Sequence, residues 1–250
     1  MSVYDVAVIG AGAAGPPAAF HLANAGHRVC VLEAVEGPRV KPCGGGMASS
    51  VQQWFPFDLS PAVDDVIRQV DFSWCLDDPV VAELPGEAPF WIVRRERLDC
   101  LLLEKAREAG ATLHCPFLVQ QIGREDGQWM IRSDCGITLK SKAVVIADGS
   151  ASPWSSQFGL GPRDLHLAST LSVRLEGLGT LNPGVARFEF GLVHHGFAWH
   201  FPIREGTNVG VGTFIDRTGM DAQPVLSAFL LELRFPANHV LRHQAAPRVL

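Results

Sequence analysis

The chain has 250 residues, of which 47% are hydrophobic and 19% are charged, and its formal net charge is −5. This hydrophobic content excludes intrinsic disorder, and the charge balance lacks the basic excess expected of a protein that grips nucleic-acid phosphates. Six scattered cysteines with no C-x-x-C pair favour neither a disulfide framework nor a structural zinc site, so no metal is predicted.

The first residues, Met1–Asp5, carry neither the basic region nor the cleavage site of a secretory signal. Together with the cysteine usage, this indicates a reducing, cytoplasmic location. The apolar window from Val6 to Gly26 approaches the length of a membrane span. It contains glycines and prolines and changes its period halfway, so a strand, a turn and a helix explain it better.

The first predicted elements form a strand–helix–strand unit. Residues 4–9 are a buried strand by pattern, a helix extends to about residue 25, and residues 29–32 form a second buried strand that ends on Glu33. Uniformly apolar strands joined by a helical crossover are typical of a parallel sheet that is covered on both faces.

Between the first strand and the helix lies the turn Gly10-x-Gly12-x-x-Gly15. The first glycine permits a tight turn, the second lets the backbone approach a pyrophosphate, and the third permits close packing of the helix on the strand. The helix start offers N–H groups to phosphates. Because two prolines follow the turn, we expect most of these groups to come from Gly12, Ala13 and Ala14.

Glu33 is placed to accept hydrogen bonds from both ribose hydroxyls of an adenosine, and its charge disfavours NADP at this site. The alternative is a glycine-rich turn in an α/β protein that binds no nucleotide. The strand, turn, helix and acidic residue together favour an adenine dinucleotide, but the fingerprint does not separate NAD from FAD.

The remainder of the chain mixes irregular, helical and β-rich segments. Residues 36–61 are irregular and rich in glycine and proline, and spaced apolar residues predict a helix over 97–108. Asp126-Gly127 between β-like runs predicts a hairpin, and a last helix covers about 225–234. Further strands are predicted near 66–74, 80–84, 90–93, 112–115, 117–122, 143–147, 171–175, 186–190, 197–201 and 208–214.

These elements predict an α/β protein in which a Rossmann-type sheet accompanies an antiparallel, β-rich substrate domain. The dinucleotide-binding domain is expected to comprise residues 1–36 and 90–155. The substrate-binding domain is expected to comprise residues 37–89 and 156–250.

Five segments carry a resemblance to a known group of flavoproteins. They are Gly10–Gly15 with Glu33, the run Lys41–Gly46 (Lys-Pro-Cys-Gly-Gly-Gly), Arg94–Asp99, Ala147-Asp148-Gly149 and the aromatic box Gly196–Pro202. Over its whole length the chain resembles the N-terminal part of the geranylgeranyl reductase family, whose members have the p-hydroxybenzoate hydroxylase fold. The cysteine–glycine run and the Trp-x-Phe-Pro of the box are the more specific parts of the match.

The resemblance implies that the cofactor is FAD. Arg95 would reach its phosphate or ribityl region, Asp148 would lie near the pyrophosphate, and Cys43 with the glycines after it would lie beside the isoalloxazine. The full set of implied cofactor-binding residues is Gly10, Gly12, Ala13, Ala14, Gly15, Glu33, Ala34, Gly44, Arg95 and Asp148.

Members of this family reduce isolated double bonds in geranylgeranyl chains of chlorophyll, quinone precursors or archaeal lipids. Such a reduction needs a hydride at one carbon, a proton at the other and an apolar slot. The implied catalytic residues are Cys43, Gly45 and Trp199, and the implied substrate-binding residues are Phe197, Trp199 and Phe201. The aromatic residues would fit an ordinary core as well, and Cys43 would also fit as a small buried hydrophobe.

The implied partners are a prenylated, lipid-like substrate and an electron donor, either NAD(P)H or a ferredoxin-like protein, with peripheral membrane contact as an option. Two other functions stay open. One is a flavin monooxygenase of the same fold, which would insert oxygen into an aromatic substrate. The other is a shortened chain that binds a dinucleotide without turnover.

The sequence departs from the family pattern at two points. Phe197 stands where the family usually places a tyrosine, which removes a hydroxyl that could orient the substrate. Related proteins continue into a Gly-Asp motif and helices that close over the flavin, and no Gly-Asp dipeptide occurs in this sequence. We therefore expect the chain to retain less than one FAD per molecule and to turn over slowly.

Overall fold

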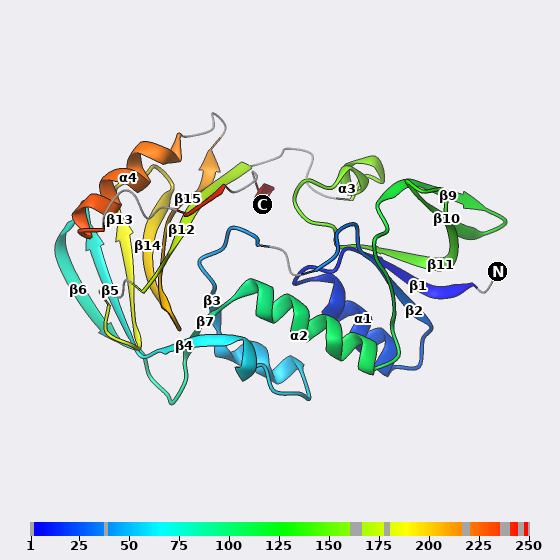
Figure 1. Cartoon of the computed structure of the whole chain (residues 1–250), viewed down its shortest axis with the longest axis horizontal. Coiled ribbons are helices and arrows are strands. Elements are labelled where there is room, and N and C mark those ends of the chain that lie inside the picture. Colours follow the sequence, from blue (N-terminus) through cyan, green and yellow to red (C-terminus); the bar gives the residue numbers. More distant parts are fainter. Residues whose placement is uncertain are drawn as a thin grey trace. The chain divides into compact units, whose positions relative to one another are not determined.

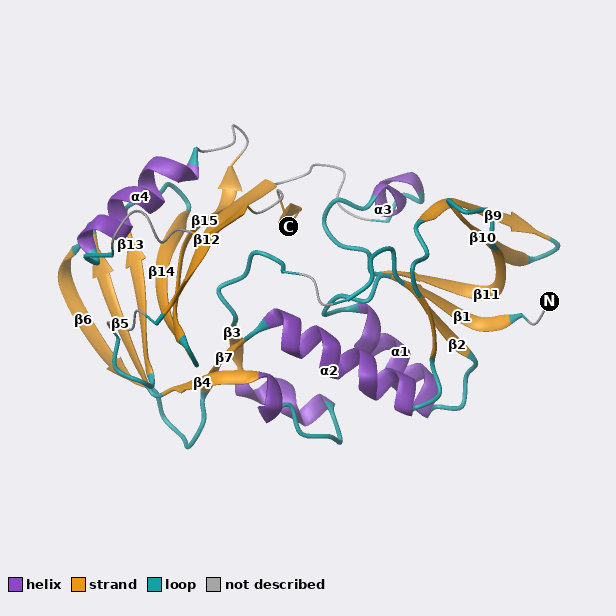
Figure 2. Ribbon diagram, viewed as in Figure 1, coloured by secondary structure: helices purple, strands orange, loops and turns teal. Residues whose placement is uncertain are grey.

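The computed structural model describes residues 3–37, 40–160, 167–177, 181–216, 221–235, 241–244 and 248–249 (Figure 1). The chain divides into two compact units. Unit 1 comprises Met1–Arg39 and Glu96–Gly161, and unit 2 comprises Val40–Arg95 and Pro162–Leu250. A largely parallel sheet in unit 1 and largely antiparallel strands in unit 2 confirm the predicted α/β fold class (Figure 2).

Unit 1 is built on a six-stranded sheet in the order β8-β2-β1-β11-β10-β9. The first four strands of this order are parallel, and the last two continue the sheet in antiparallel fashion. The strands are β1 (Tyr4–Ile9), β2 (Val29–Leu32), β8 (Thr112–His114), β9 (Val119–Glu125), β10 (Gln128–Ser133) and β11 (Thr138–Ile146).

The centre of this sheet forms where the sequence is most apolar. β1 and β2 pair in register from Val6 with Val29 to Ile9 with Leu32, and α1 (Gly15–Asn24) crosses between them and packs on both. The carboxyl ends of β1 and β2 therefore lie beside each other, which brings the glycine turn after β1 next to the residue that follows β2.

The other elements of unit 1 follow local sequence signals. α2 (Arg95–Glu108) buries Leu98, Leu102 and Ala106 at helical spacing, and α3 (Pro153–Gln157) begins after Ser152, whose side chain accepts from the N–H of Trp154. Asp126 and Gly127 both have positive φ and join β9 to β10, so the predicted two-residue hairpin is confirmed.

Unit 2 contains an eight-stranded sheet and a three-stranded one. The larger sheet has the order β16-β12-β15-β14-β13-β5-β6, with β17 also paired to β12, and the smaller has the order β3-β7-β4. The strands are β3 (Gly46–Ala48), β4 (Val63–Ile67), β5 (Gln69–Trp74), β6 (Asp77–Glu83), β7 (Phe90–Val93), β12 (Leu167–Glu176), β13 (Val185–Phe190), β14 (Gly196–Ile203), β15 (Gly206–Asp216), β16 (Leu241–Gln244) and β17 (Arg248–Val249). Its helices are η1 (Ser49–Trp54), η2 (Ser60–Ala62) and α4 (Ala222–Glu232).

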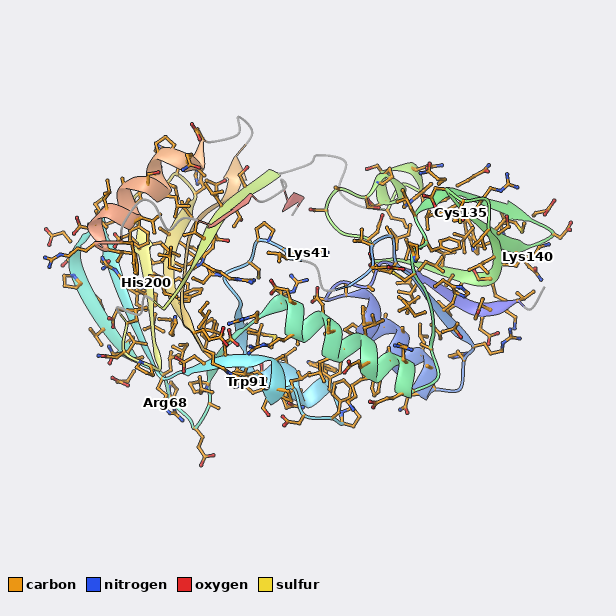
Figure 3. All side chains as sticks on the ribbon, viewed as in Figure 1. Lys41, Arg68, Trp91, Cys135, Lys140 and His200 are labelled. Atoms are coloured by element: carbon orange, nitrogen blue, oxygen red, sulfur yellow. The ribbon has the colours of Figure 1, made fainter. Side chains whose placement is uncertain are left out.

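The two faces of the larger sheet are covered by different elements. On one face, Val209 and Val211 of β15 pack with Leu226 and Phe229 of α4 in a single apolar cluster. His200 of β14, which Figure 3 labels, is buried on this face. Its ring centroid lies 5.6 Å from that of Phe235. Because side chains alternate along a strand, the neighbouring aromatic residues of β14 face the opposite way.

The structure corrects the predicted partner of one strand. Residues 90–93 were expected in the sheet of the dinucleotide-binding domain, but β7 pairs with β3 and β4 in the smaller sheet of unit 2. A short apolar run predicts a buried strand without identifying its partner, because burial on both faces occurs in either sheet.

Candidate functional site

The glycine turn of unit 1 is compact because two of its glycines lie against backbone atoms. Gly10 has a φ of +100°, and a Cβ placed there would lie 2.5 Å from the carbonyl oxygen of Ala147. A Cβ on Gly15 would lie 1.9 Å from the carbonyl oxygen of Gly10. Any larger residue would therefore open the turn, which explains the first and third glycines of the motif.

The middle of the turn presents backbone to solvent at the N-terminus of α1. Gly12 is buried, whereas Ala13 and Ala14 are exposed. The helix has proline in its first turn and no side-chain cap at Ala14. An exposed helix start of this kind suits an anion such as a diphosphate, because N–H groups and the helix dipole point toward it.

Glu33 follows β2 and is 5% exposed. Its Oε2 accepts a hydrogen bond of 2.7 Å from the backbone N–H of Ala11, and its Oε1 accepts one of 3.0 Å from the N–H of Val35. These bonds fix the carboxylate against the glycine turn. A carboxylate oxygen can accept more than one hydrogen bond, so this geometry leaves capacity for sugar hydroxyls.

A pocket of about 270 Å³ opens at the carboxyl ends of the strands of unit 1. Four of the residues predicted to bind the cofactor line it together, namely Gly10, Glu33, Ala34 and Asp148. Phe117 and Trp154 supply apolar walls that sequence reasoning missed. Their only sequence signal was an apolar position in a β-like run and an aromatic residue just after the Asp148-Gly149 pair.

Asp148 indicates that the pocket suits a ligand with a hydrogen-bond donor. Its Oδ1 is buried and has no hydrogen-bond partner within the described residues. A buried acceptor without a donor is costly, and a sugar hydroxyl in the pocket would supply the missing donor. The residues of unit 1 therefore fit the adenosine and sugar portion of a flavin dinucleotide: a backbone turn for phosphate, two carboxylates for hydroxyls and apolar walls for an adenine.

The second predicted group of residues lies in unit 2, in the loop from Lys41, which Figure 3 labels, to Gly46. Gly45 has a φ of +85°, and its carbonyl accepts a 2.9 Å hydrogen bond from the N–H of Val93. A Cβ on Gly45 would lie 2.3 Å from the carbonyl oxygen of Val93. Because Gly46 then pairs with Ile92, the smaller sheet holds the end of the loop in place.

Gly44 lies directly on the aromatic residues of β14. A Cβ there would lie 2.9 Å from Cε2 of Phe201 and 3.0 Å from Nε1 of Trp199. Cys43, immediately before it, is half-buried. The structure thus brings together Cys43, Gly44, Trp199 and Phe201, which the sequence separates by more than 150 positions.

The indole of Trp199 extends across the neighbouring strand. Trp199 pairs with Gly210 of β15, and a Cβ on Gly210 would lie 2.2 Å from the indole, so only glycine leaves room for it. The indole Nε1 donates a 2.9 Å hydrogen bond to Oδ1 of Asn208, which is itself buried. Sequence reasoning missed Asn208, although the pattern Gly206-x-Asn208-x-Gly210-x-Gly212 placed a single polar side chain among glycines on one face of a strand.

Beyond Trp199, aromatic rings continue along the same face. The centroid of Phe188 lies 5.2 Å from that of Phe197 and 5.0 Å from that of Phe201. Phe72 and Phe190 extend the contacts at 5.8–6.2 Å. Trp199 and Phe201 are buried, whereas Phe197 is partly exposed. We call these six residues the aromatic ladder: Phe72, Phe188, Phe190, Phe197, Trp199 and Phe201.

Two adjacent arginines precede the body of α2. The Nε of Arg94 donates a 3.0 Å hydrogen bond to the fully buried carboxylate of Asp64 in unit 2. Arg95, the arginine predicted to reach the cofactor, is the first residue of α2. Within the described residues, no group of three His, Cys, Asp or Glu side chains is arranged to hold a metal ion.

None of the helices in the described part of the chain has the length and apolar composition that crossing a bilayer requires.

Comparison with known proteins identifies the cofactor. Residues 5–72 match a family model described as an FAD binding domain. This match includes the glycine turn, Glu33 and the Cys43 loop. It confirms the prediction that the cofactor is FAD rather than NAD.

Two curated proteins match most of the chain. A digeranylgeranylglycerophospholipid reductase of Methanothermobacter thermautotrophicus is 30% identical over 224 residues, which cover 84% of this chain and 57% of the relative. A menaquinone reductase of Mycobacterium tuberculosis is 28% identical over 225 residues, which cover 83% of this chain and 54% of the relative. The chain thus spans just over half the length of these relatives.

A solved structure shows the same fold. A geranylgeranyl bacteriochlorophyll reductase-like protein from Thermoplasma acidophilum superimposes with a TM-score of 0.82 at 20% sequence identity, covering 100% of this chain and 66% of that protein. The motifs, the matching model and these likenesses agree: the chain contains an FAD binding domain, has the fold of FAD-dependent oxidoreductases, and is similar to members of the geranylgeranyl reductase family.

Proposed function

We propose that the protein reduces isolated carbon–carbon double bonds in a prenyl chain, with NAD(P)H or a ferredoxin-like protein as the source of electrons. The observation that carries this proposal is the packing of the Cys43–Gly46 loop on the aromatic ladder. A glycine-lined backbone next to a continuous row of rings suits an apolar, flexible chain that carries no group for polar recognition. The similarity to a reductase of digeranylgeranyl lipids supports the same substrate class.

In this proposal unit 1 is the FAD-binding domain and unit 2 the substrate-binding domain. Glu33 and Asp148 accept hydrogen bonds from sugar hydroxyls, the turn from Gly10 to Gly15 receives the diphosphate, and Arg95 supports the phosphate or ribityl region. When bound and reduced, FAD supplies a hydride to the double bond. The protein must then bind the chain, exclude water and guide a proton to the other carbon.

Cys43 is the residue of unit 2 that we assign to this last task. It lies beside Gly44, which contacts both Trp199 and Phe201, so its backbone lies next to the rings that would bind the alkene. We propose that the thiol shapes proton delivery or the position of the substrate. The buried indole of Trp199 and the ring of Phe201 keep this end of the ladder dry.

The test is an anaerobic reaction of the chain with excess FAD, a chemical reductant and a prenylated lipid, with products identified by mass. Reduction predicts the addition of two hydrogen atoms for each double bond. Cys43→Ala should keep its FAD content and change the rate or the products. Cys135→Ala, which removes an exposed thiol of unit 1, is the matched control and should behave as the unsubstituted chain does.

Other outcomes would assign a different function. Oxygen inserted into an aromatic substrate in air, with no reduction of the prenyl chain, would indicate a flavin monooxygenase. Identical rates and products from Cys43→Ala and the unsubstituted chain would reduce Cys43 to a packing residue.

A further inference from the structure

We infer that Asn208 is a positioning residue that fixes the backbone of Cys43 relative to the indole of Trp199. Its side chain makes both connections at once: Oδ1 accepts from Nε1 of Trp199 at 2.9 Å, and Nδ2 donates to the carbonyl oxygen of Cys43 at 3.0 Å. The catalytic part of this inference rests on the proposed function, whereas the connection itself does not.

The chemistry of the two partners determines which side chain can stand at this position. The indole N–H can only donate and the carbonyl of Cys43 can only accept. The bridging group must therefore offer one acceptor and one donor in a fixed planar arrangement, which is what a carboxamide provides. Aspartate would satisfy the indole but would set a carboxylate oxygen against the carbonyl of Cys43.

The surrounding strand is shaped around this bridge. On the face of β15 that carries Asn208, the alternate residues Gly210 and Gly212 have no side chain, and the indole of Trp199 fills that space. Asn208 is 4% exposed, so water does not replace its partners at low cost. On the opposite face, Val209 and Val211 pack beneath α4 and hold the strand in place.

Hydrogen bonds to backbone atoms anchor the loop on both sides of Gly44. Downstream, Gly45 bonds to Val93 and Gly46 pairs with Ile92. At Cys43 itself, the bond from Asn208 fixes the carbonyl that precedes Gly44. Gly44 lies so close to Trp199 and Phe201 that no Cβ would fit between them. A shift of the Cys43 carbonyl would therefore move the loop across the rings. Asn208 thereby sets where the Cys43 thiol lies with respect to a substrate on the aromatic ladder.

The experiment uses brief alkylation of the folded, full-length chain, followed by peptide mapping of each cysteine. Asn208→Ala should raise the rate of labelling at Cys43 by about tenfold, the effect expected from the loss of a buried hydrogen bond. Exposed Cys75 and Cys135 serve as internal references with unchanged rates. Buried Cys30, whose thiol pKa burial raises to about 12, should stay unlabelled if the fold is intact.

Two further variants separate positioning from a general loss of stability. Asn208→Asp should release Cys43 while the Trp199 indole N–H stays protected from solvent exchange in 15N NMR spectra, whereas Asn208→Ala should expose both. The matched control is Gln52→Ala, which removes another carboxamide of unit 2, one that donates to the carbonyl of Phe57 and accepts from the N–H of Leu59. It should leave both readouts unchanged.

Equal labelling of Cys43 in all of these variants would overturn the inference, whatever the activity. If labelling rises as expected, the products of prenyl reduction decide the catalytic part. A changed distribution of partly reduced products in Asn208→Asp would support a positioning role. An unchanged distribution from a chain that does reduce the lipid would limit Asn208 to holding the loop, and no reduction by any form would contradict the proposed function alone.

Discussion

Both units of the protein contain a run of obligatory glycines, but the glycines are required for different reasons. In unit 1, backbone atoms leave no room for a Cβ: the carbonyl oxygen of Ala147 lies against Gly10, and the carbonyl oxygen of Gly10 lies against Gly15. In unit 2, side chains take up the space that a Cβ would need: the rings of Phe201 and Trp199 lie against Gly44, and the ring of Phe90 lies against Gly46. The first arrangement is a local property of a turn between a strand and a helix, whereas the second depends on rings distant in the sequence.

The two kinds of contact predict different tolerance of amino-acid substitution in the two glycine runs. A clash with a carbonyl oxygen must be relieved by moving the chain, whereas a clash with a ring edge can be relieved by a small rotation of the side chain. We therefore expect substitutions of Gly10 or Gly15 to unfold the turn of unit 1 and substitutions of Gly44 or Gly46 to act locally. Gly45, where a Cβ would lie 2.3 Å from the carbonyl oxygen of Val93, should respond as the glycines of unit 1 do. Substitutions of Gly15 and Gly44 test this contrast directly, and changes at His200 and Glu33 test one further property of each unit.

The largest effect is expected at the glycine turn. Gly15→Ala places a Cβ 1.9 Å from the carbonyl oxygen of Gly10, so the free energy of unfolding should fall by about 3 kcal/mol or more. Urea denaturation measures the change. The control is Gly123→Ala in β9, where a Cβ would meet no atom within 4 Å. If both variants were equally stable, backbone contact would not be what demands glycine in the turn.

The second prediction is a loss of stability on acidification that originates in unit 2. Burial, assisted by Arg187 on the neighbouring strand, lowers the pKa of His200 from 6.5 to about 4. The folded state therefore favours the neutral imidazole, and its stabilising contribution is complete above pH 6.5. It should be lost between pH 6.5 and 4, by about 3 kcal/mol in total.

Denaturation midpoints across this pH range, compared with those of His200→Gln, isolate the contribution of His200. The variant should lose the part of the slope that belongs to this group while other groups titrate in both proteins. Parallel stability curves for the two proteins would mean that His200 does not titrate in this way.

The third prediction concerns binding in unit 1. Glu33→Ala removes a carboxylate held by the N–H groups of Ala11 and Val35 and should weaken FAD binding by about 1.5–3 kcal/mol, the usual contribution of hydrogen bonds to a charged group. Titration of the apoprotein with FAD measures it. Glu33→Gln, which keeps the shape and one acceptor, should lose less. Equal dissociation constants for all three proteins would show that Glu33 does not bind the ribose.

The smallest effect is expected in the loop of unit 2. Gly44→Ala places a Cβ about 3 Å from the edges of Phe201 and Trp199, which should cost about 1–2 kcal/mol of stability while FAD binding is retained. Denaturation and FAD titration of the same sample separate the two quantities. A loss of stability as large as that of Gly15→Ala would remove the contrast between the two glycine runs.

Much of unit 1 could be predicted from the sequence because its signals are local. The glycine turn, the crossover helix and the acidic residue after β2 lie within 33 residues, and the Asp126-Gly127 hairpin needs only its own φ angles. The pocket walls Phe117 and Trp154 could not be predicted, because their position depends on which strand borders which.

In unit 2 the motif residues were found through the family resemblance, but their contacts were not. The connection from Asn208 to Cys43 spans 165 positions, and no local pattern identifies such a partner. The strand at residues 90–93 was assigned to the wrong sheet for the same reason, since its apolar run fits either one. Local residue patterns predict turns and helix caps well, whereas contacts between residues far apart in the sequence are known only from the three-dimensional structure.

The most direct test of the proposed reaction is the reoxidation of reduced flavin in the absence of oxygen. The chain is loaded with FAD, reduced chemically and mixed with a prenylated lipid or with its fully saturated analogue, while flavin absorbance is followed. We expect reoxidation only with the unsaturated lipid, at a rate that Cys43→Ala changes. Reoxidation at the same rate with both lipids, or only after air is admitted, would contradict the assignment of this protein as a prenyl reductase.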